Sequence, residues 1–226
     1  MLEAVLSSPL FGLTLSAAAW CAGCWLHKKT GFLLCNPLLI AAALIIAVLA
    51  LLRIPYERYA LGGDFIKLML GPVTAVLALN IYYQRDILKK HFLPVLAGCL
   101  AGSAASVGSI LLLCRLFHVD EALTASLMPK SVTTAIAMGI AESRGGVAGI
   151  AAAAVMVAGL TGAVFAPLFA KLFRITDPVA EGLAIGACSH ALGTTRAMEI
   201  GQVQGAMSSI AICVCGIMTS ILALFL

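Results

Sequence analysis

Charged residues are scarce in this chain, and their scarcity excludes most classes of soluble protein. Asp, Glu, Lys and Arg make up 11% of the 226 residues, and apolar residues make up 62%. Soluble domains carry about a quarter charged residues and roughly half apolar ones. The composition therefore predicts an integral membrane protein. The formal net charge of +4 arises mainly from Lys and Arg in the connections between apolar segments, so it reports topology and does not indicate a nucleic-acid partner.

Catalytic and metal-binding motifs are also missing. The sequence has no His-Glu-x-x-His, no Gly-x-Ser-x-Gly and no phosphate-binding glycine loop. The spacing of Cys21, Cys24 and His27 is similar to a metal motif, but one helix end lacks the second ligand pair that a closed site needs. All eight cysteines lie in or at the edge of apolar segments, where a thiol packs as a small hydrophobic group. We therefore expect no enzyme activity, no metal and no other cofactor.

Long apolar runs are abundant, and they predict membrane spans. Windows of about 20 apolar residues match the bilayer core, and they occur at 5–26, 33–52, 92–114, 147–170 and 204–226. Three further segments are apolar but interrupted: 61–83 by Gly71-Pro72, 121–142 by Pro129, and 179–203 around Gly193. Because Pro removes a backbone donor and Gly weakens a helix, we expect each to divide into two half-helices. Such breaks persist at membrane depth only where they are buried or line a wet cavity.

The basic residues predict the topology. Pairs such as Lys28-Lys29 and Lys171/Arg174 mark cytoplasmic connections. Two connections can both be cytoplasmic only if the chain crosses the membrane an even number of times between them. The segment broken at Pro129 is therefore assigned as a re-entrant hairpin, which does not cross the membrane. The predicted fold is an all-α integral membrane protein with about seven spans plus that hairpin, and eight full spans are the alternative. The chain is expected to form one transmembrane domain, 1–226, in which the whole–broken–whole triplets of 33–117 and 147–226 form an inverted repeat.

Lys130 is the first candidate for an anion site. It follows Pro129 in the stretch "LMPKSVTTAIAM", and Pro is favoured in the first turn of a helix. The N–H groups after the break have no helical partner, so their partial positive charge favours an anion. Lys130 adds a full charge and, at helical spacing, shares a face with neighbouring hydroxyls. The hydroxyl-bearing candidates for ligand binding are Ser131, Thr133 and Thr134.

A second candidate set lies in the segment 179–203. Arg196 suits a carboxylate because its planar guanidinium donates two parallel hydrogen bonds. Glu199 is expected either to neutralise Arg196 when the site is empty or to carry a coupled proton. His190 titrates near neutrality and is the other candidate for proton coupling. The hydroxyl-bearing candidates here are Thr194 and Thr195.

Structural roles are the alternative for every one of these residues. Lys130 and Arg196 would also fit snorkelling to an interface, and hydroxyls in membrane helices often bond the preceding turn or join helices. A hydrogen-bonded structural role explains His190 equally well. Ionisable residues within a membrane are costly, however, and by default mark a pathway. Two broken segments that each combine a cation with hydroxyls favour the functional interpretation.

Four stretches of the sequence resemble the LrgB/CidB family of bacterial membrane proteins, which includes the membrane-transport half of the plastid glycolate/glycerate translocator. The stretches are "NPLLIAAALIIAVL" (36–49), "GGDFIKLMLGPVTAVLAL" (62–79), "PKSVTTAIAM" (129–138) and "SHALGTTRAMEIGQVQGAMSSIAICVCGIMTSILA" (189–223). The resemblance covers nearly the whole chain, and the last two stretches are long and specific.

The resemblance implies two functions. Some relatives are described as antiholin-like, act with a small LrgA/CidA-type membrane protein, and are linked to murein hydrolase export and autolysis. Others resemble carriers of small carboxylates such as glycolate, glycerate or pyruvate. The residues favour the second function, because a holin-like assembly has no evident need for cations at helix breaks. We therefore expect a multi-pass carrier of small monocarboxylates in the bacterial plasma membrane, in contact with membrane lipid, either alone, as a homo-oligomer, or with an LrgA/CidA-type partner.

Overall fold

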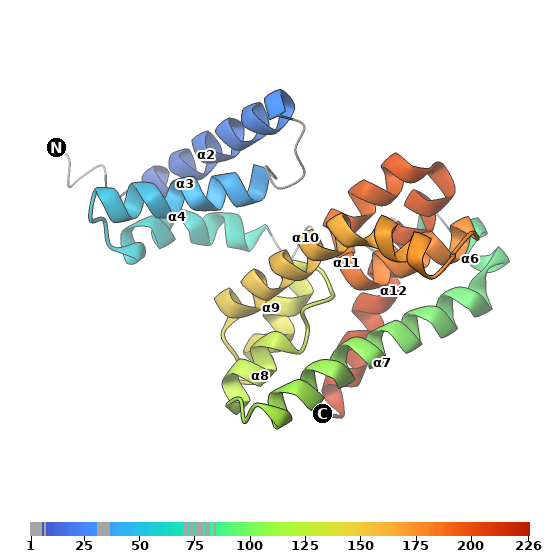
Figure 1. Cartoon of the computed structure of the whole chain (residues 1–226). Helices are drawn as coiled ribbons and strands as arrows, with labels where there is room; N and C mark the ends of the chain where they lie inside the picture. The colour runs from blue at the N-terminus through green and yellow to red at the C-terminus, as the bar shows by residue number, and fades with distance from the viewer. Residues whose placement is uncertain are drawn as a thin grey trace. The chain divides into compact units, whose positions relative to one another are not determined.

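All regular structure in the described parts of the chain is helical (Figure 1). The computed structural model describes residues 8–30, 37–69 and 85–226, together with positions 6, 72, 75, 79, 82 and 83. Four of the described helices are long and apolar enough to cross a membrane: α2 (Pro9–Thr30), α7 (Phe92–Leu116), α10 (Ala148–Leu172) and α12 (Gln202–Leu224). The all-α class is confirmed, and the number of spans stays a prediction. The chain divides into two compact units, Met1–Val73 and Thr74–Leu226.

The first unit contains three described helices that pack through glycine. They are α2, α3 (Pro37–Leu51) and α4 (Tyr56–Leu68). Helices α2 and α4 cross at Gly12 and Gly62, where a Cβ atom on Gly62 would lie 2.3 Å from the carbonyl oxygen of Pro9. The hydroxyls of Ser16 and Tyr59, 2.9 Å apart, share a hydrogen bond across the same pair. Small residues therefore allow the backbones of these helices to approach closely.

The predicted interruption of 61–83 is described only in part. Helix α4 begins at Tyr56, passes Gly62 and Gly63 without a break, and ends at Leu68. The Gly71-Pro72 step, where we expected the helix to divide, lies mostly outside the described residues. The inverted repeat, which needs this break, stays a prediction.

The second unit has three apolar clusters that hold seven described helices together. Beyond α7, α10 and α12, these are α6 (Arg85–Lys90), α8 (Glu121–Leu127), α9 (Thr134–Ser143) and α11 (Pro178–Ile200). One cluster joins α7, α11 and α12 through residues such as Cys99, Leu183 and Met207. A second joins α9 to α10, and a third joins α7, α9 and α12. Burial of these side chains fixes the two broken segments against the long helices.

The segment 121–142 is broken near Pro129, as predicted. Helix α8 ends at Leu127, and α9 begins at Thr134. The details differ, because Pro129 lies in the turn between the helices and Thr133 is the N-terminal cap of α9. The prediction that Lys130 sits in the first helical turn is therefore wrong. Since Lys130 belongs to the turn, it shares no helix face with the threonines.

The segment 179–203 is also interrupted, but at His190 and not at Gly193. His190 has φ 41° and ψ −137°, outside the helical region. Its ring is buried, and Nε2 donates a hydrogen bond of 2.7 Å to the carbonyl oxygen of Val155 on α10. Gly159 leaves room for that ring, because a Cβ atom there would lie 2.4 Å from His190 Cε1. The hydrogen bond to Val155 therefore holds His190 in a backbone conformation that is costly for a non-glycine residue.

Candidate functional site

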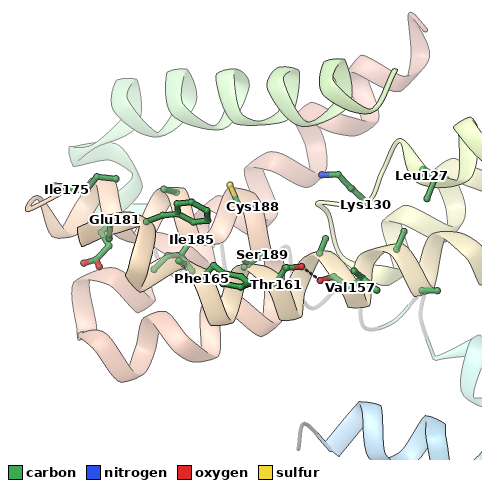
Figure 2. Close-up of a pocket in the computed structure, with 18 of the residues that line it drawn as sticks. Leu127, Lys130, Val157, Thr161, Phe165, Ile175, Glu181, Ile185, Cys188 and Ser189 are labelled. Atoms are coloured by element: carbon green, nitrogen blue, oxygen red, sulfur yellow. Dashed lines mark hydrogen bonds between the residues drawn. The ribbon is translucent and has the colours of Figure 1, made fainter. Parts of the chain in front are cut away.

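Lys130 lines a cavity of about 850 Å³ in the second unit. The cavity lies between α10, α11 and the turn that carries Lys130 (Figure 2). Its α10 wall consists mainly of small or apolar residues: Ala153, Ala154, Val157, Ala158, Gly162 and Phe165. Its volume falls within the range of roughly 300–1,000 Å³ that is usual for small-molecule sites.

The ammonium group of Lys130 contacts neutral oxygens. Nζ donates to Ser131 Oγ at 3.1 Å and to Ser106 Oγ at 3.2 Å. Ser106 Oγ in turn donates to Ser131 Oγ at 2.8 Å. Neither ion pair found in the described ranges involves Lys130. An ammonium has three donors, so one N–H and the full positive charge remain for an anion.

Besides Lys130, the polar or charged residues that line the cavity are Thr161 of α10 and Glu181, Cys188 and Ser189 of α11. Cys188 and Ser189 both line it, and Figure 2 shows the Cys188 sulfur and the Lys130 nitrogen in the same region of the cavity. Ser189 is fully buried, and its hydroxyl has no hydrogen-bond partner among the described residues. Such an unsatisfied buried hydroxyl is unusual. Because the hydroxyl is fully covered in this structure, a ligand oxygen could reach it only if α10 and α11 moved apart.

Ser189 can pack directly against α10 only because residue 162 is glycine. A Cβ atom on Gly162 would lie 1.7 Å from Ser189 Oγ and 2.5 Å from Ser189 Cβ. Glycine at this position therefore lets the Ser189 side chain lie against the backbone of α10.

The predicted threonine ligands form local bonds or lie elsewhere. Thr194 Oγ1 donates to the His190 carbonyl at 3.0 Å and shares a 2.7 Å hydrogen bond with Ser208 Oγ. Thr195 Oγ1 donates to the Ala191 carbonyl at 3.2 Å. These bonds match the structural alternative, in which hydroxyls bond the preceding turn or join helices. Neither Thr133 nor Thr134 lines the Lys130 cavity, although the buried Thr133 hydroxyl has no partner in the described ranges.

Arg196 and Lys130 do not share a cavity. Arg196 Nη1 and Glu199 Oε2 form an ion pair of 2.5 Å on a partly exposed surface. Arg196 lines a different cavity, of about 660 Å³, together with Lys171 and Arg174. The predicted neutralisation of Arg196 by Glu199 is thus present. A single clamp that uses both Lys130 and Arg196 is not what the structure contains.

The residues that form the site are therefore only partly the predicted ones. Of the nine predicted residues, the structure brings Lys130 and Ser131 together. It adds Ser106, Cys188 and Ser189, which come from α7 and α11. His190 lies next to this group in the chain, but its ring is directed to the α10 backbone. Within the described ranges, no group of His, Cys, Asp and Glu is arranged to hold a metal ion.

This arrangement can bind one negative charge beside an apolar body. The carboxylate would accept hydrogen bonds from Lys130 and from nearby hydroxyls, which are stronger than neutral bonds because the groups are charged. The remainder of the ligand would contact the apolar wall of α10.

Comparison with known proteins places this geometry in a family. A model of the LrgB-like family matches residues 16–226. The antiholin-like protein LrgB of Bacillus subtilis (strain 168) is 41% identical over 213 residues, which cover 94% of this chain and 92% of that protein. The uncharacterized protein YxaC of the same strain is 38% identical over 208 residues, covering 92% and 90%. The antiholin-like protein LrgB of Bacillus mycoides (strain KBAB4) is 38% identical over 213 residues, covering 94% and 93%. No solved structure matches the chain.

Proposed function

The chain belongs to the LrgB-like family, and we propose that it is a multi-pass protein of the bacterial plasma membrane with an antiholin-like role. In this role it regulates murein hydrolase export and autolysis, together with an LrgA/CidA-type membrane partner. The support is the similarity to two relatives named antiholin-like protein LrgB, at 41% and 38% identity. The names of the relatives favour this function over transport, which none of them mentions.

Complementation tests the regulatory function. The chain and an LrgA/CidA-type partner would be expressed in a bacterium that lacks its own family members. We expect lower murein hydrolase activity in the medium and slower lysis than with the partner alone. The variant Lys130→Gln should act like wild type, because a regulator depends on contacts with its partner. Unchanged hydrolase release in the presence of the chain would refute this function.

As a second function, we propose that the chain carries small monocarboxylates, such as hydroxy or keto acids, across the membrane. One observation supports it: the Lys130 ammonium lies in a cavity where its contacts are the hydroxyls of Ser106 and Ser131. A cation in a membrane domain is costly without a counter-charge. Glu181 lines the same cavity but forms no ion pair with Lys130 in the described ranges, so a bound carboxylate would supply that counter-charge.

In the carrier, Lys130 is the anion ligand and the hydroxyls orient the carboxylate. Ser131 and Ser106 hold the ammonium group. Since Arg196 is paired with Glu199 in another cavity, the proposal does not use Arg196 as a ligand. This proposal includes no enzymatic step.

Uptake into proteoliposomes tests the carrier function. Purified protein would be reconstituted and supplied with labelled glycolate, glycerate or pyruvate. Loss of a charge-assisted hydrogen bond costs about 1.5–3 kcal/mol, so Lys130→Gln should raise the half-saturating concentration by roughly ten- to a hundredfold. The matched control is Lys90→Gln, which removes the same charge from an exposed position on α6. Uptake no faster than in protein-free liposomes would refute the carrier, and equal uptake by all three proteins would refute Lys130 as its ligand, whereas the regulatory test above would be unaffected.

A further inference from the structure

A second polar cavity, of about 700 Å³, lies where α7 ends and α8 begins. It is separate from the Lys130 cavity, with no charged lining residue in common. Four charged or titratable side chains line it: Arg115, His118, Glu121 and Arg144. They come from the end of α7, the following loop, the start of α8 and the loop after α9. Segments that are distant in the sequence thus bring two guanidinium groups to one place.

The two guanidinium groups of this cavity are available to an anion. Neither Arg115 nor Arg144 takes part in the ion pairs found in the described part of the chain. The nearby carboxylate of Asp120 accepts a 2.8 Å hydrogen bond from the Leu123 N–H, so it caps α8. Glu121 is therefore the one carboxylate among the described side chains that line the cavity. With Asp120 still charged as a cap, two arginines and two carboxylates lie in this region, and neither guanidinium forms an ion pair in the described part of the chain.

Arg144 is held in place by a bond that leaves most of its donors free. Its Nη1 donates to the Ala223 carbonyl at the end of α12, at 2.5 Å. A guanidinium has five N–H donors, so the planar group can still donate two parallel bonds to an anion. The bond to α12 therefore fixes the orientation of Arg144 toward the cavity that it lines.

The cavity lies at the ends of two candidate membrane spans. Arg115 is in the last turn of α7, and the cavity also includes Leu226, just beyond α12. Large apolar side chains near these helix ends are exposed, including Leu116, Phe117 and Phe225. A pocket with two guanidinium groups at the ends of membrane helices suits the phosphate of a lipid headgroup, because a guanidinium group donates paired hydrogen bonds to phosphate oxygens.

We propose that this cavity binds the phosphate group of an anionic phospholipid headgroup, with Arg115 and Arg144 as its ligands. The two guanidinium groups donate to phosphate oxygens, and the acyl chains lie along the exposed apolar residues at the end of α7. Inorganic phosphate would form the same hydrogen bonds with the arginines, but it would not contact the exposed apolar residues that border the cavity. The border therefore favours a lipid as the source of the phosphate.

Titration of the purified full-length protein in a neutral detergent tests this site. The probes are short-chain phosphatidylglycerol, short-chain phosphatidylcholine and inorganic phosphate, and the readout is the thermal unfolding midpoint. We expect saturable stabilisation by phosphatidylglycerol and little by phosphatidylcholine. The variant Arg115→Gln/Arg144→Gln should weaken that binding by at least about tenfold, as expected for lost charge-assisted bonds.

Matched variants separate the site from general charge attraction. Lys89→Gln/Lys90→Gln removes two exposed charges from α6 and should bind phosphatidylglycerol like wild type. Arg115→Gln alone keeps the Arg144 bond to α12, so it tests the site even if the double variant fails to fold. Stabilisation by inorganic phosphate that needs both arginines would support phosphate recognition and assign a free anion as its source. Equal phosphatidylglycerol binding by wild type and Arg115→Gln, or equal effects of the two lipids, would overturn the proposal.

Discussion

The contact between Gly162 and Ser189 gives a sharp test of how α10 and α11 form the Lys130 cavity. Replacing Gly162 with Ala adds a methyl group at a point 1.7 Å from Ser189 Oγ and 2.5 Å from Ser189 Cβ. Neither distance is compatible with van der Waals contact, so the helices must separate or the serine must turn away. Overpacking of this kind costs about 1–3 kcal/mol. The gain in helix propensity from Gly to Ala, about 1 kcal/mol, offsets part of that cost.

The second substitution of the test removes the obstacle. Ser189→Gly deletes both atoms that the new methyl group would meet, whereas Ser189→Ala keeps Cβ at 2.5 Å. In a double-mutant cycle, Ser189→Gly should therefore recover about 1–3 kcal/mol of the cost of Gly162→Ala. Ser189→Ala should recover less.

Denaturant unfolding of the detergent-solubilised protein, followed by circular dichroism, measures these free energies. Gly108→Ala is the control, because a Cβ atom there meets nothing within 4 Å in the middle of α7. We expect Gly108→Ala to be neutral or stabilising. If Gly162→Ala were as stable as this control, or if Ser189→Gly gave no rescue, the packing of α11 on α10 described here would be wrong.

Three further predictions concern the other site residues. His190→Ala leaves the buried carbonyl that it bonds without a donor, and should lower the free energy of unfolding by about 1–3 kcal/mol in the same assay; an unchanged value would contradict its role as an anchor. The Arg196–Glu199 pair is partly exposed, so Arg196→Gln should change stability by less than about 1 kcal/mol and leave carboxylate uptake near wild type; a tenfold loss of uptake would restore Arg196 as a ligand. A maleimide should label Cys188 in the Lys130 cavity, and excess carboxylate should slow that labelling in wild type but not in Lys130→Gln; mass spectrometry of the labelled peptide reports it.

The sequence predicts the breaks in this fold better than it predicts the side chains that the breaks bring together. Pro129 ends α8 because of its own covalent structure, so the break can be recognised without tertiary information. The kink in α11 is different. It falls at His190, whose partner Val155 lies 35 residues earlier in the chain. Gly193, the residue with the greatest backbone freedom nearby, remains within the second half of the helix.

The difference between local and long-range contacts also explains which site residues can be predicted from the sequence. The pairing of Arg196 with Glu199 is local, three residues apart, and was predicted. Ser106 was missed because it lies on α7, 24 residues before Lys130, in a run of small residues that reads as helix packing. Ser189 was seen only as a neighbour of the break. Its unsatisfied hydroxyl is a property of the packed structure, and no pattern in the sequence reveals it.

The charged residues that line the Lys130 cavity have an electrical consequence for the carrier proposal. Glu181 lines the same cavity as Lys130, so the empty cavity holds one cationic and one anionic side chain, and a bound carboxylate would add one net negative charge. A voltage of 100 mV acts on one elementary charge with about 2.3 kcal/mol when the charge crosses the whole membrane. The return of the empty site would therefore be insensitive to voltage, and the crossing of the loaded site would be driven or opposed by it.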